Sequence, residues 1–188
     1  MSLDYAILGF LNYKPMTGYD LKKFFDDSVR HFWHADQSQI YRSLSKLKDN
    51  GWVEMVVEEQ DDRPDRKVHS ITSAGKQALL EWMLGPPPIG HPHSAPLIQV
   101  FFSGMFTDDQ VLEMFKRNLQ MMEGMLHSYD PVPRVIEEYK QILGSEREAF
   151  FWELTYDLGM RTAKAQLEWA QSVIEKIESG KVPQEKKI

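Results

Sequence analysis

Residues 36–75 constrain the fold of this chain more than any other stretch. Residues 36–50 carry apolar side chains at helical spacing and are followed by a glycine. Two runs with strand-like patterning come next, at 52–59 and 66–71, separated by a polar tip. A further helical pattern starts at Ala74. The stretch therefore predicts a helix, a two-stranded hairpin and a second helix in direct succession.

The helix at 36–50 has two faces of opposite character. Its apolar residues follow the i, i+4, i+7 spacing that predicts one buried stripe: Ile40, Leu44 and Leu47. The opposite face is small, polar and partly cationic, with Ser38, Arg42, Ser45 and Asp49, and with Lys46 beside it. A helix with such an exposed face, joined to a hairpin, is typical of a winged helix that contacts DNA.

Helix ends can be placed from capping residues. Thr17 and Asp20 have capping-box spacing, as do Asp36 and Gln39, so a helix is expected to open at each. Gly51 suits the left-handed conformation that often follows a helix.

The hairpin is expected to bury one face. Val53, Met55 and Val57 should point to that face, and Val68 and Ile71 should anchor the return strand. The helix that follows is expected to use Leu79, Leu80 and Met83 as its apolar residues.

A proline-rich stretch at 85–96 indicates a domain boundary. Five prolines in this stretch prevent a helix and favour an extended spacer. The prediction is a winged helix-turn-helix domain at 1–84, a linker at 85–96 and an all-helical dimerisation domain at 97–188. The expected fold class is mainly α with a small β-hairpin.

The last predicted helix, from about residue 145 to 179, has two apolar stripes. One comprises Phe151, Leu154, Leu158, Ala165, Trp169 and Val173. The other comprises Trp152, Tyr156, Met160, Ala163, Leu167, Ala170, Ile174 and Ile177. Two stripes need two partners, and a second copy of the chain is the simplest second partner because most soluble oligomers are twofold symmetric. The alternative is a helix in the middle of a monomeric bundle. We expect the dimer seam at Phe151, Leu154, Leu158, Trp169 and Val173.

Composition and motifs argue against several classes of protein. The chain has no cysteine, which excludes disulfides and thiolate metal sites. No apolar run approaches membrane-spanning length, the N-terminus is a poor secretion signal, and a cytoplasmic protein is expected. Motifs for phosphate-binding loops, serine hydrolases and zinc proteases are missing, so neither enzyme activity nor a cofactor is expected. His31 with His34, and His91 with His93, lack a third ligand at a recognised spacing, and no metal site is predicted.

The charge of the chain is acidic. The net charge is −6, and residues 1–84 alone carry eleven basic and thirteen acidic side chains. Binding to DNA would therefore have to come from a local cluster of cations. The acidic balance keeps open a second interpretation, in which a winged helix serves as a protein-interaction module.

Several motifs in the first half occur together in one family. They are Ala6-Ile7-Leu8-Gly9-Phe10-Leu11, Thr17-Gly18-Tyr19-Asp20-Leu21, the segment 39–47 followed by Gly51-Trp52-Val53, and the segment 66–76. With these motifs the chain resembles the PadR family of bacterial transcriptional regulators. The helical second half resembles the longer subgroup that includes virulence-gene activators.

The resemblance implies a homodimer, joined through C-terminal helices, that binds a pseudo-palindromic operator in double-stranded DNA. Family members repress or activate, and several respond to phenolic or hydrophobic small molecules. Repression is the expected sign here, and activation without a small-molecule effector is the alternative. Trp152 and Trp169 could stack a small aromatic effector, although dimer packing is the favoured role for both. The tip of the hairpin departs from the pattern, because Asp61, Asp62 and Asp65 would repel phosphates.

The candidate DNA-contacting residues follow from the helix-turn-helix geometry, in which the start of the second helix enters the major groove. Those nearest the bases are Gln37, Ser38, Gln39, Tyr41 and Arg42, with Ser45 and Lys46 directed toward phosphates. Tyr19, Lys22, Arg63, Arg66 and Lys67 could reach the DNA backbone. The competing interpretation is a place in the core for Tyr19 and a solvated surface side chain for the others.

Overall fold

The structure is a computed structural model that describes residues 2–30, 32–59, 65–86 and 94–183. By its internal contacts the chain divides into two units. One comprises Met1–Ile89 with Glu138–Ser145, and the other comprises Gly90–Glu137 with Glu146–Ile188. The family of folds expected from the sequence is confirmed: the chain is mainly helical with one small antiparallel sheet.

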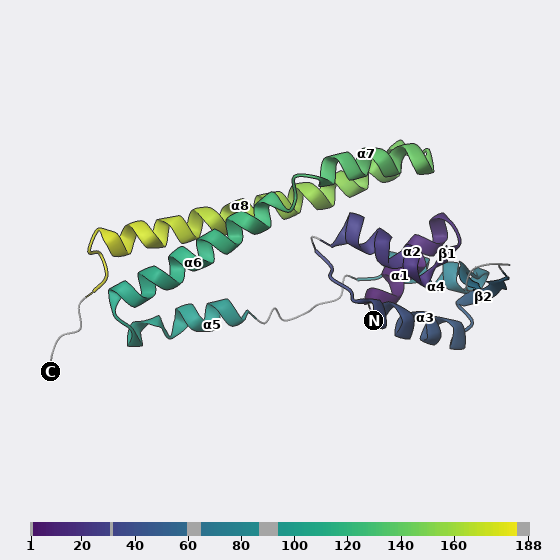
Figure 1. Cartoon of the computed structure of the whole chain (residues 1–188), viewed down its shortest axis with the longest axis horizontal. Coiled ribbons are helices and arrows are strands. Elements are labelled where there is room, and N and C mark those ends of the chain that lie inside the picture. The colour runs from purple at the N-terminus through teal and green to yellow at the C-terminus, as the bar shows by residue number, and fades with distance from the viewer. Residues whose placement is uncertain (1, 31, 60–64, 87–93, 184–188) are drawn as a thin grey trace. The chain divides into compact units, whose positions relative to one another are not determined.

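The first unit holds four α-helices and the sheet (Figure 1). The helices are α1 (Ser2–Tyr13), α2 (Gly18–Phe24), α3 (Gln37–Asp49) and α4 (Ser73–Leu84), and a π-helical turn at Phe25–Val29 extends α2. The capping boxes predicted at Thr17 and Asp36 are both present, and Gly51 has a φ of 72°. Local sequence signals thus place the start of α2 and both ends of α3.

The sheet has three strands in the order β1-β3-β2. Strands β2 (Val53–Glu58) and β3 (Arg66–Ile71) form the expected hairpin, and the two-residue β1 (Met16–Thr17) pairs with the other edge of β3. Because β3 is the central strand, His69 is its most buried residue, opposite both Met16 and Met55. Val68 and Ile71, expected to be the weaker anchors of this hairpin, are both half-buried.

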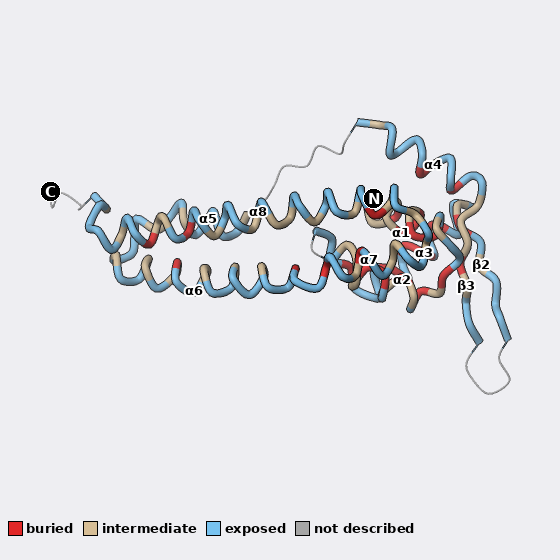
Figure 2. Tube along the Cα trace, turned by 90° about the horizontal axis from the view of Figure 1, so that it is seen from above, coloured by how far each residue is buried: buried red, intermediate tan, exposed pale blue. Residues whose placement is uncertain are grey.

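One hydrophobic core organises the first unit. Ile40, Leu44 and Leu47 of α3 are almost completely buried in it, together with residues of α1 and α2 such as Leu8 and Leu21. Figure 2 shows these buried segments in red. The apolar stripe predicted for α3 is confirmed, and it fixes which face of this helix remains in solvent.

Two burial expectations in this unit were wrong. In β2, Val57 is exposed because burial ends after Met55 along the strand. In α4, Leu79 is buried, but Leu80 and Met83 have 52% and 67% of their surface exposed. Only one side of α4 packs against the core.

The second unit is entirely helical in the residues that the structure describes. Its helices are α5 (Ala95–Phe101), α6 (Asp108–His127), α7 (Val132–Leu143) and α8 (Glu146–Glu178), with a 3₁₀ turn at Ser103–Met105; the last residues of α7 are counted with the first unit. A capping box at Thr107 opens α6. At 1.5 Å per residue, the 33 residues of α8 span about 50 Å.

The two apolar stripes of α8 differ in burial. The stripe that contains Trp152, Ala170 and Ile174 packs within the unit, against residues of α6 and α7. In the other stripe, Phe151, Leu154, Leu158 and Trp169 have 47%, 49%, 66% and 42% of their surface exposed. Val173 is half-buried beside Phe115 of α6. A single chain therefore covers one stripe and leaves most of the other in solvent.

No helix within the described ranges combines the length and the apolar character needed to cross a bilayer.

Candidate nucleic-acid interface

The start of α3 is fixed by hydrogen bonds at Asp36. The Asp36 carboxylate accepts from the backbone N–H of Gln39 at 2.7 Å and from the Ser38 hydroxyl at 2.6 Å. The Gln39 side-chain oxygen accepts in return from the Asp36 backbone N–H at 3.0 Å. The Ser38 hydrogen bond, followed by that of the Gln39 backbone, lowers the pKa of Asp36. The first turn of α3 is therefore rigid, and Ser38 and Gln39 each use part of their hydrogen-bonding capacity inside the protein.

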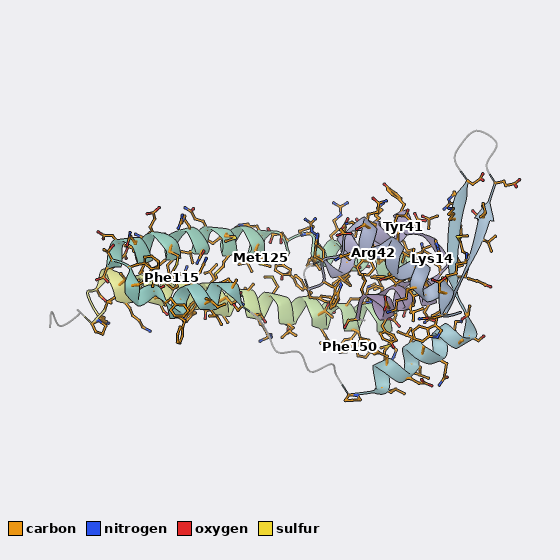
Figure 3. All side chains as sticks on the ribbon, turned by 90° about the horizontal axis from the view of Figure 1, so that it is seen from below. Lys14, Tyr41, Arg42, Phe115, Met125 and Phe150 are labelled. Atoms are coloured by element: carbon orange, nitrogen blue, oxygen red, sulfur yellow. The ribbon has the colours of Figure 1, made fainter. Side chains whose placement is uncertain are left out.

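The candidate residues on α3 share one exposed face. All seven lie in solvent: Gln37, Ser38, Gln39, Tyr41, Arg42, Ser45 and Lys46. They share this face because Ile40, Leu44 and Leu47 hold the other side of the helix in the core. Tyr41 and Arg42 are labelled on this helix in Figure 3. The structure thus brings the predicted base-contacting residues together on a single surface.

Tyr41 packs against the beginning of α2. A Cβ atom built on Gly18 would lie 2.5 Å from the Tyr41 ring, so only glycine leaves room for the ring there. Tyr41 nevertheless keeps 46% of its surface exposed. Its ring orientation is set by the helix pair, and its outer edge remains available to a ligand.

The candidate residues of α2 lie beside this contact. Tyr19 is 69% exposed, so the alternative of a core role for Tyr19 is wrong. Lys22 forms an ion pair with Asp26 one turn later. Part of the charge predicted to meet phosphate is therefore engaged within α2.

A candidate cation of the hairpin is also paired with carboxylates. Arg66 lies 3.6 Å from Asp20 and 3.5 Å from Glu58 through its guanidinium nitrogens. Lys67 is exposed on the next position of β3. Arg63, Asp61 and Asp62 lie outside the described residues.

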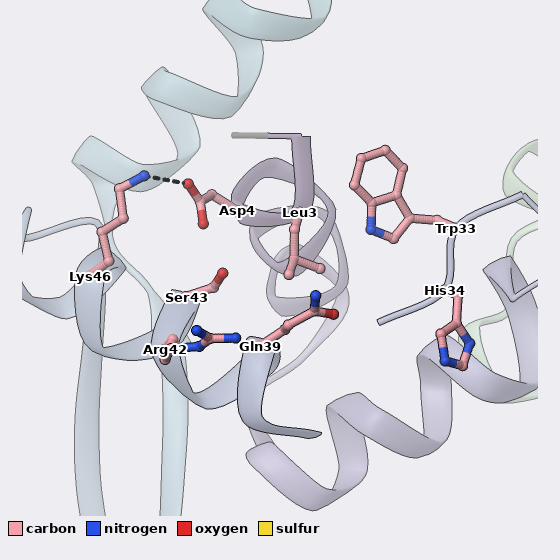
Figure 4. A pocket seen from close by; sticks show the side chains of 8 residues that line it. All are labelled: Leu3, Asp4, Trp33, His34, Gln39, Arg42, Ser43 and Lys46. Carbon is pink, nitrogen blue, oxygen red and sulfur yellow. Dashed lines mark hydrogen bonds and ion pairs between the residues drawn. The ribbon is translucent and has the colours of Figure 1, made fainter. Parts of the chain in front are cut away.

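A depression of about 390 Å³ lies between the start of α1 and α3 (Figure 4). The Lys46 ammonium is 2.7 Å from the Asp4 carboxylate across this depression. Asp4 is buried, with 7% of its surface exposed. The depression is lined by Leu3, Asp4, Trp33, His34, Gln39, Arg42, Ser43 and Lys46.

Asp4 is the residue of this surface that sequence reasoning missed. Its partner Lys46 is 42 positions away in the chain, and no local pattern connects the two. A polar residue in the first turn of an otherwise apolar helix was the one available signal, and capping accounts for it equally well.

The candidate cations therefore fall into two groups. Lys22, Lys46 and Arg66 each have a carboxylate partner. Arg42 and Lys67 form no ion pair with any residue whose position is described. Among the candidate cations that the structure describes, Arg42 and Lys67 are therefore the ones whose charge is not shared with a carboxylate in an ion pair.

The structure gives little support to the other candidate sites, namely the histidine pairs and the two tryptophans. Across the described ranges, no cluster of three His, Asp or Glu side chains could hold a metal ion. His31, His91 and His93 lie outside those ranges, and His34 lines the depression beside α3. Trp152 packs against the cluster that contains Tyr129, whereas the exposed Trp169 lies edge-on to Phe115 of a different cluster, at 5.6 Å between ring centroids.

Comparison with known families gives two matches along the chain. Residues 7–81 match the transcriptional regulator PadR-like family, and residues 94–178 match the virulence activator alpha C-terminal family. The first match spans α3 and the hairpin, and the second spans the helical unit.

Individual relatives agree with these matches. The negative transcriptional regulator PadR of Bacillus subtilis is 26% identical over 179 residues, which are 94% of this chain and 97% of that protein. The probable transcriptional regulator Rv1176c of Mycobacterium tuberculosis is 40% identical over 86 residues, 46% of each chain.

Solved structures show the same architecture. B. subtilis PadR in complex with operator DNA superposes with a TM-score of 0.80 at 25% identity, over 94% of this chain and 99% of that one. The Vibrio cholerae virulence activator AphA superposes with a TM-score of 0.75 at 23% identity, over 94% and 98%, which is a likeness of fold.

Proposed function

Since this chain belongs to the PadR-like family of transcriptional regulators, we propose that it binds a pseudo-palindromic operator as a homodimer through the exposed face of α3. The observation that carries the proposal is the division of α3 into two faces. Its apolar residues are locked in the core, and every candidate contact residue on the helix is in solvent. Such a helix can enter the major groove without rearrangement.

Sequence would be read by the first turns of α3. Arg42 can pair bidentately with guanine, and Gln37 with adenine. Arg42 suits this role because no carboxylate of the described residues occupies its guanidinium. Gln39 keeps its amide N–H groups for a base, since its oxygen is used in the cap. Tyr41 and Ser38 complete the base-facing set, and Ser45 lies toward the flanking phosphates. Lys46, which the sequence also directed toward phosphates, is paired with Asp4 instead.

Contacts to the DNA backbone would come from residues around α3. Tyr19 is prominently exposed at the start of α2. Lys67 on β3 forms no ion pair with the residues that the structure describes. Lys22 and Arg66 would have to share their charges with the carboxylates they already contact. Arg63 completes the proposed set from outside the described residues. These contacts position the protein and carry no sequence information themselves.

Dimerisation is proposed through the exposed stripe of α8. Phe151, Leu154, Leu158 and Trp169 form it, and Val173 continues it at its buried end. Helix α5 and the turn after it add further exposed apolar side chains, which the sequence interpretation did not assign: Leu97, Ile98, Phe101, Phe102, Met105 and Phe106. Apolar surface on this scale is typical of an interface, and a second copy would bury it.

Repression, relieved by a small aromatic effector, is the proposed mode of regulation. Support comes from the negative regulator PadR, which is similar over nearly the whole chain and has been crystallised with p-coumaric acid. The alternative is activation without an effector, which the match to the virulence activator family favours. In either case, a regulator of this kind would act in the cytoplasm.

A mobility-shift titration tests the proposal. DNA from upstream of the gene should shift at protein concentrations that leave a shuffled DNA of equal composition unbound. Gln37→Ala should weaken the upstream complex and leave the shuffled DNA unchanged, because Gln37 is proposed to contact a base. Gln166→Ala, an equally exposed glutamine on α8, is the matched control and should bind like the parent.

Two outcomes would contradict the proposal. Equal affinity for upstream and shuffled DNA would show that binding is not sequence-specific. Absence of any shift at low salt, with capture of a protein partner through the same α3 face, would favour the protein-interaction module instead.

A further inference from the structure

The Asp4–Lys46 pair is unusual among the ion pairs of the first unit. The Asp4 side chain is only 9% exposed, whereas the Lys46 side chain is 54% exposed. In the pairs formed by Lys22 and Arg66, every carboxylate is at least 36% exposed. Burial of a charge is costly unless it is paired and hydrogen-bonded. The position of Asp4 in the first turn of α1 also favours its negative charge.

Lys46 reaches Asp4 from the proposed DNA-binding side of the protein. It lies one helical turn after Arg42, and both residues line the same depression (Figure 4). An ammonium group at this position would ordinarily meet a phosphate of the DNA backbone. Here a carboxylate already sits 2.7 Å from the ammonium nitrogen, so the pair as a whole has no net charge.

We infer that Asp4 is a positioning residue for DNA binding: it ties α1 to α3 through Lys46 and withholds the Lys46 charge from DNA phosphates. The inference rests on the proposed DNA-binding function. Its consequence is low affinity for arbitrary DNA, because non-specific binding is driven by phosphate neutralisation. Arg42, which forms no ion pair with a carboxylate of the described ranges, is left to act on bases.

The salt dependence of binding measures this effect directly. Each phosphate that a protein cation neutralises contributes about 0.9 to the slope of log affinity against log salt concentration. A purely structural role of Asp4 would change the affinity or the stability and leave that slope unaltered.

The experiment compares the parent, Asp4→Asn, Lys46→Met and the double variant on a shuffled duplex. Asp4→Asn frees Lys46 and should steepen the slope by about 0.9. Lys46→Met should leave the slope of the parent unchanged, yet should remove the added 0.9 in the Asp4→Asn background. Asp4→Asn should also raise the affinity for the shuffled duplex at low salt, since a gained phosphate contact acts on DNA of any sequence.

Asp157→Asn is the matched control. Asp157 pairs with Arg161 at 2.8 Å on α8, so its substitution makes the same change in net charge away from α3. Its slope should equal that of the parent. If Asp157→Asn steepens the slope as much as Asp4→Asn does, the change in net charge alone explains the salt dependence, and the inference is overturned.

The outcomes separate the two proposals. If Lys46→Met makes the slope of the parent shallower by about 0.9, Lys46 already contacts a phosphate and the inference is overturned, while DNA binding stands. If the parent binds no DNA at low salt, the proposed function fails and this inference fails with it. Should Asp4→Asn not fold, as checked by circular dichroism and thermal melting, the Lys46→Met comparison decides alone.

Discussion

Side chains on the outer face of α3 differ in how much of their bonding capacity the protein already uses. Ser38 and Gln39 serve the helix cap, Lys46 is paired with Asp4, and Tyr41 packs against Gly18. Arg42 forms no hydrogen bond or ion pair with the described residues, although its charge acts on the nearby Asp36 carboxylate. We therefore expect specificity to be concentrated at Arg42.

Arg42→Ala should weaken operator binding by about 1–3 kcal/mol, because a bidentate contact to guanine is lost. Fluorescence anisotropy with labelled operator provides the measurement. Arg161→Ala, which removes an exposed arginine from α8, should bind like the parent. Unchanged affinity of a folded Arg42→Ala dimer would remove Arg42 from the contact surface.

Gly75 marks a close approach between α4 and the start of the hairpin. A Cβ atom at this position would lie 2.2 Å from the backbone oxygen of Trp52. Gly75→Ala should lower the free energy of unfolding by about 1–3 kcal/mol through overpacking. Gly9→Ala is the control in α1, where a Cβ meets nothing within 4 Å, and should not destabilise. Urea denaturation measures the stability of both variants. Equal stabilities of Gly75→Ala and Gly9→Ala would contradict the prediction.

His69 should make stability depend on pH. Burial, with smaller contributions from Lys48 and Lys67, lowers its pKa below the ordinary 6.5, and its Nδ1 has no partner among the described residues. The unfolded chain therefore takes up the proton first as the pH falls. Stability should be full above pH 6.5 and should decline below it until the folded pKa is reached. His69→Gln should flatten this decline in thermal melts, and an identical pH profile would exclude the contribution of His69.

Among the elements, α3 was predictable because its signals are local. Asp36, Gln39 and Gly51 mark its ends, and Ile40 with Leu44 marks its buried stripe, all within one short stretch. Strand β1 was not predictable, since two residues carry no periodicity and its existence depends on pairing with β3. The burial of His69 follows from that same pairing. Local patterns thus give helices and their faces, whereas partners distant in sequence decide which strand is central.

Helix α8 illustrates what periodicity can and cannot show. The sequence revealed two apolar stripes, and the structure shows which one a single chain buries. The exposed stripe is the one predicted for the dimer seam. The exposed apolar side chains of α5 were missed because they form an almost continuous run, from which no exposed face can be read.

Leu154→Glu combined with Leu158→Glu should give a monomer. Both side chains are half or more exposed in the single chain, so charges there are tolerated until a second copy must cover them. Light scattering of the purified variant measures the mass. Gln171→Glu places a charge on an exposed polar position of α8 away from this stripe and should keep the parental mass. A double-leucine variant of unchanged mass would argue against the seam.

For the whole molecule, the acidic net charge is compatible with DNA binding only if a small group of cations, close together on one surface, contacts the DNA. The ion pairs at Lys22, Lys46 and Arg66 make that set smaller than the sequence alone indicated. Which charges are paired could not be predicted, because Asp4 and Lys46 meet only after α1 and α3 pack together.

An aromatic effector should change both the thermal stability of the protein and its affinity for operator. If p-coumarate binds only the folded state, millimolar concentrations should raise the melting temperature and lower the affinity for operator. Trp152→Ala and Trp169→Ala, which change two separate clusters, indicate which region binds. A melting temperature independent of p-coumarate would remove this compound as the effector.

Hydroxyl-radical footprinting on the upstream operator tests the central claim most directly, namely that two copies present their α3 faces to successive turns of one duplex. The account predicts two protected patches with centres about 10 base pairs apart, or a multiple of that spacing. Both patches should disappear together in Leu154→Glu/Leu158→Glu at concentrations that saturate the parent. A single protected patch, unchanged in that double variant, would contradict the account.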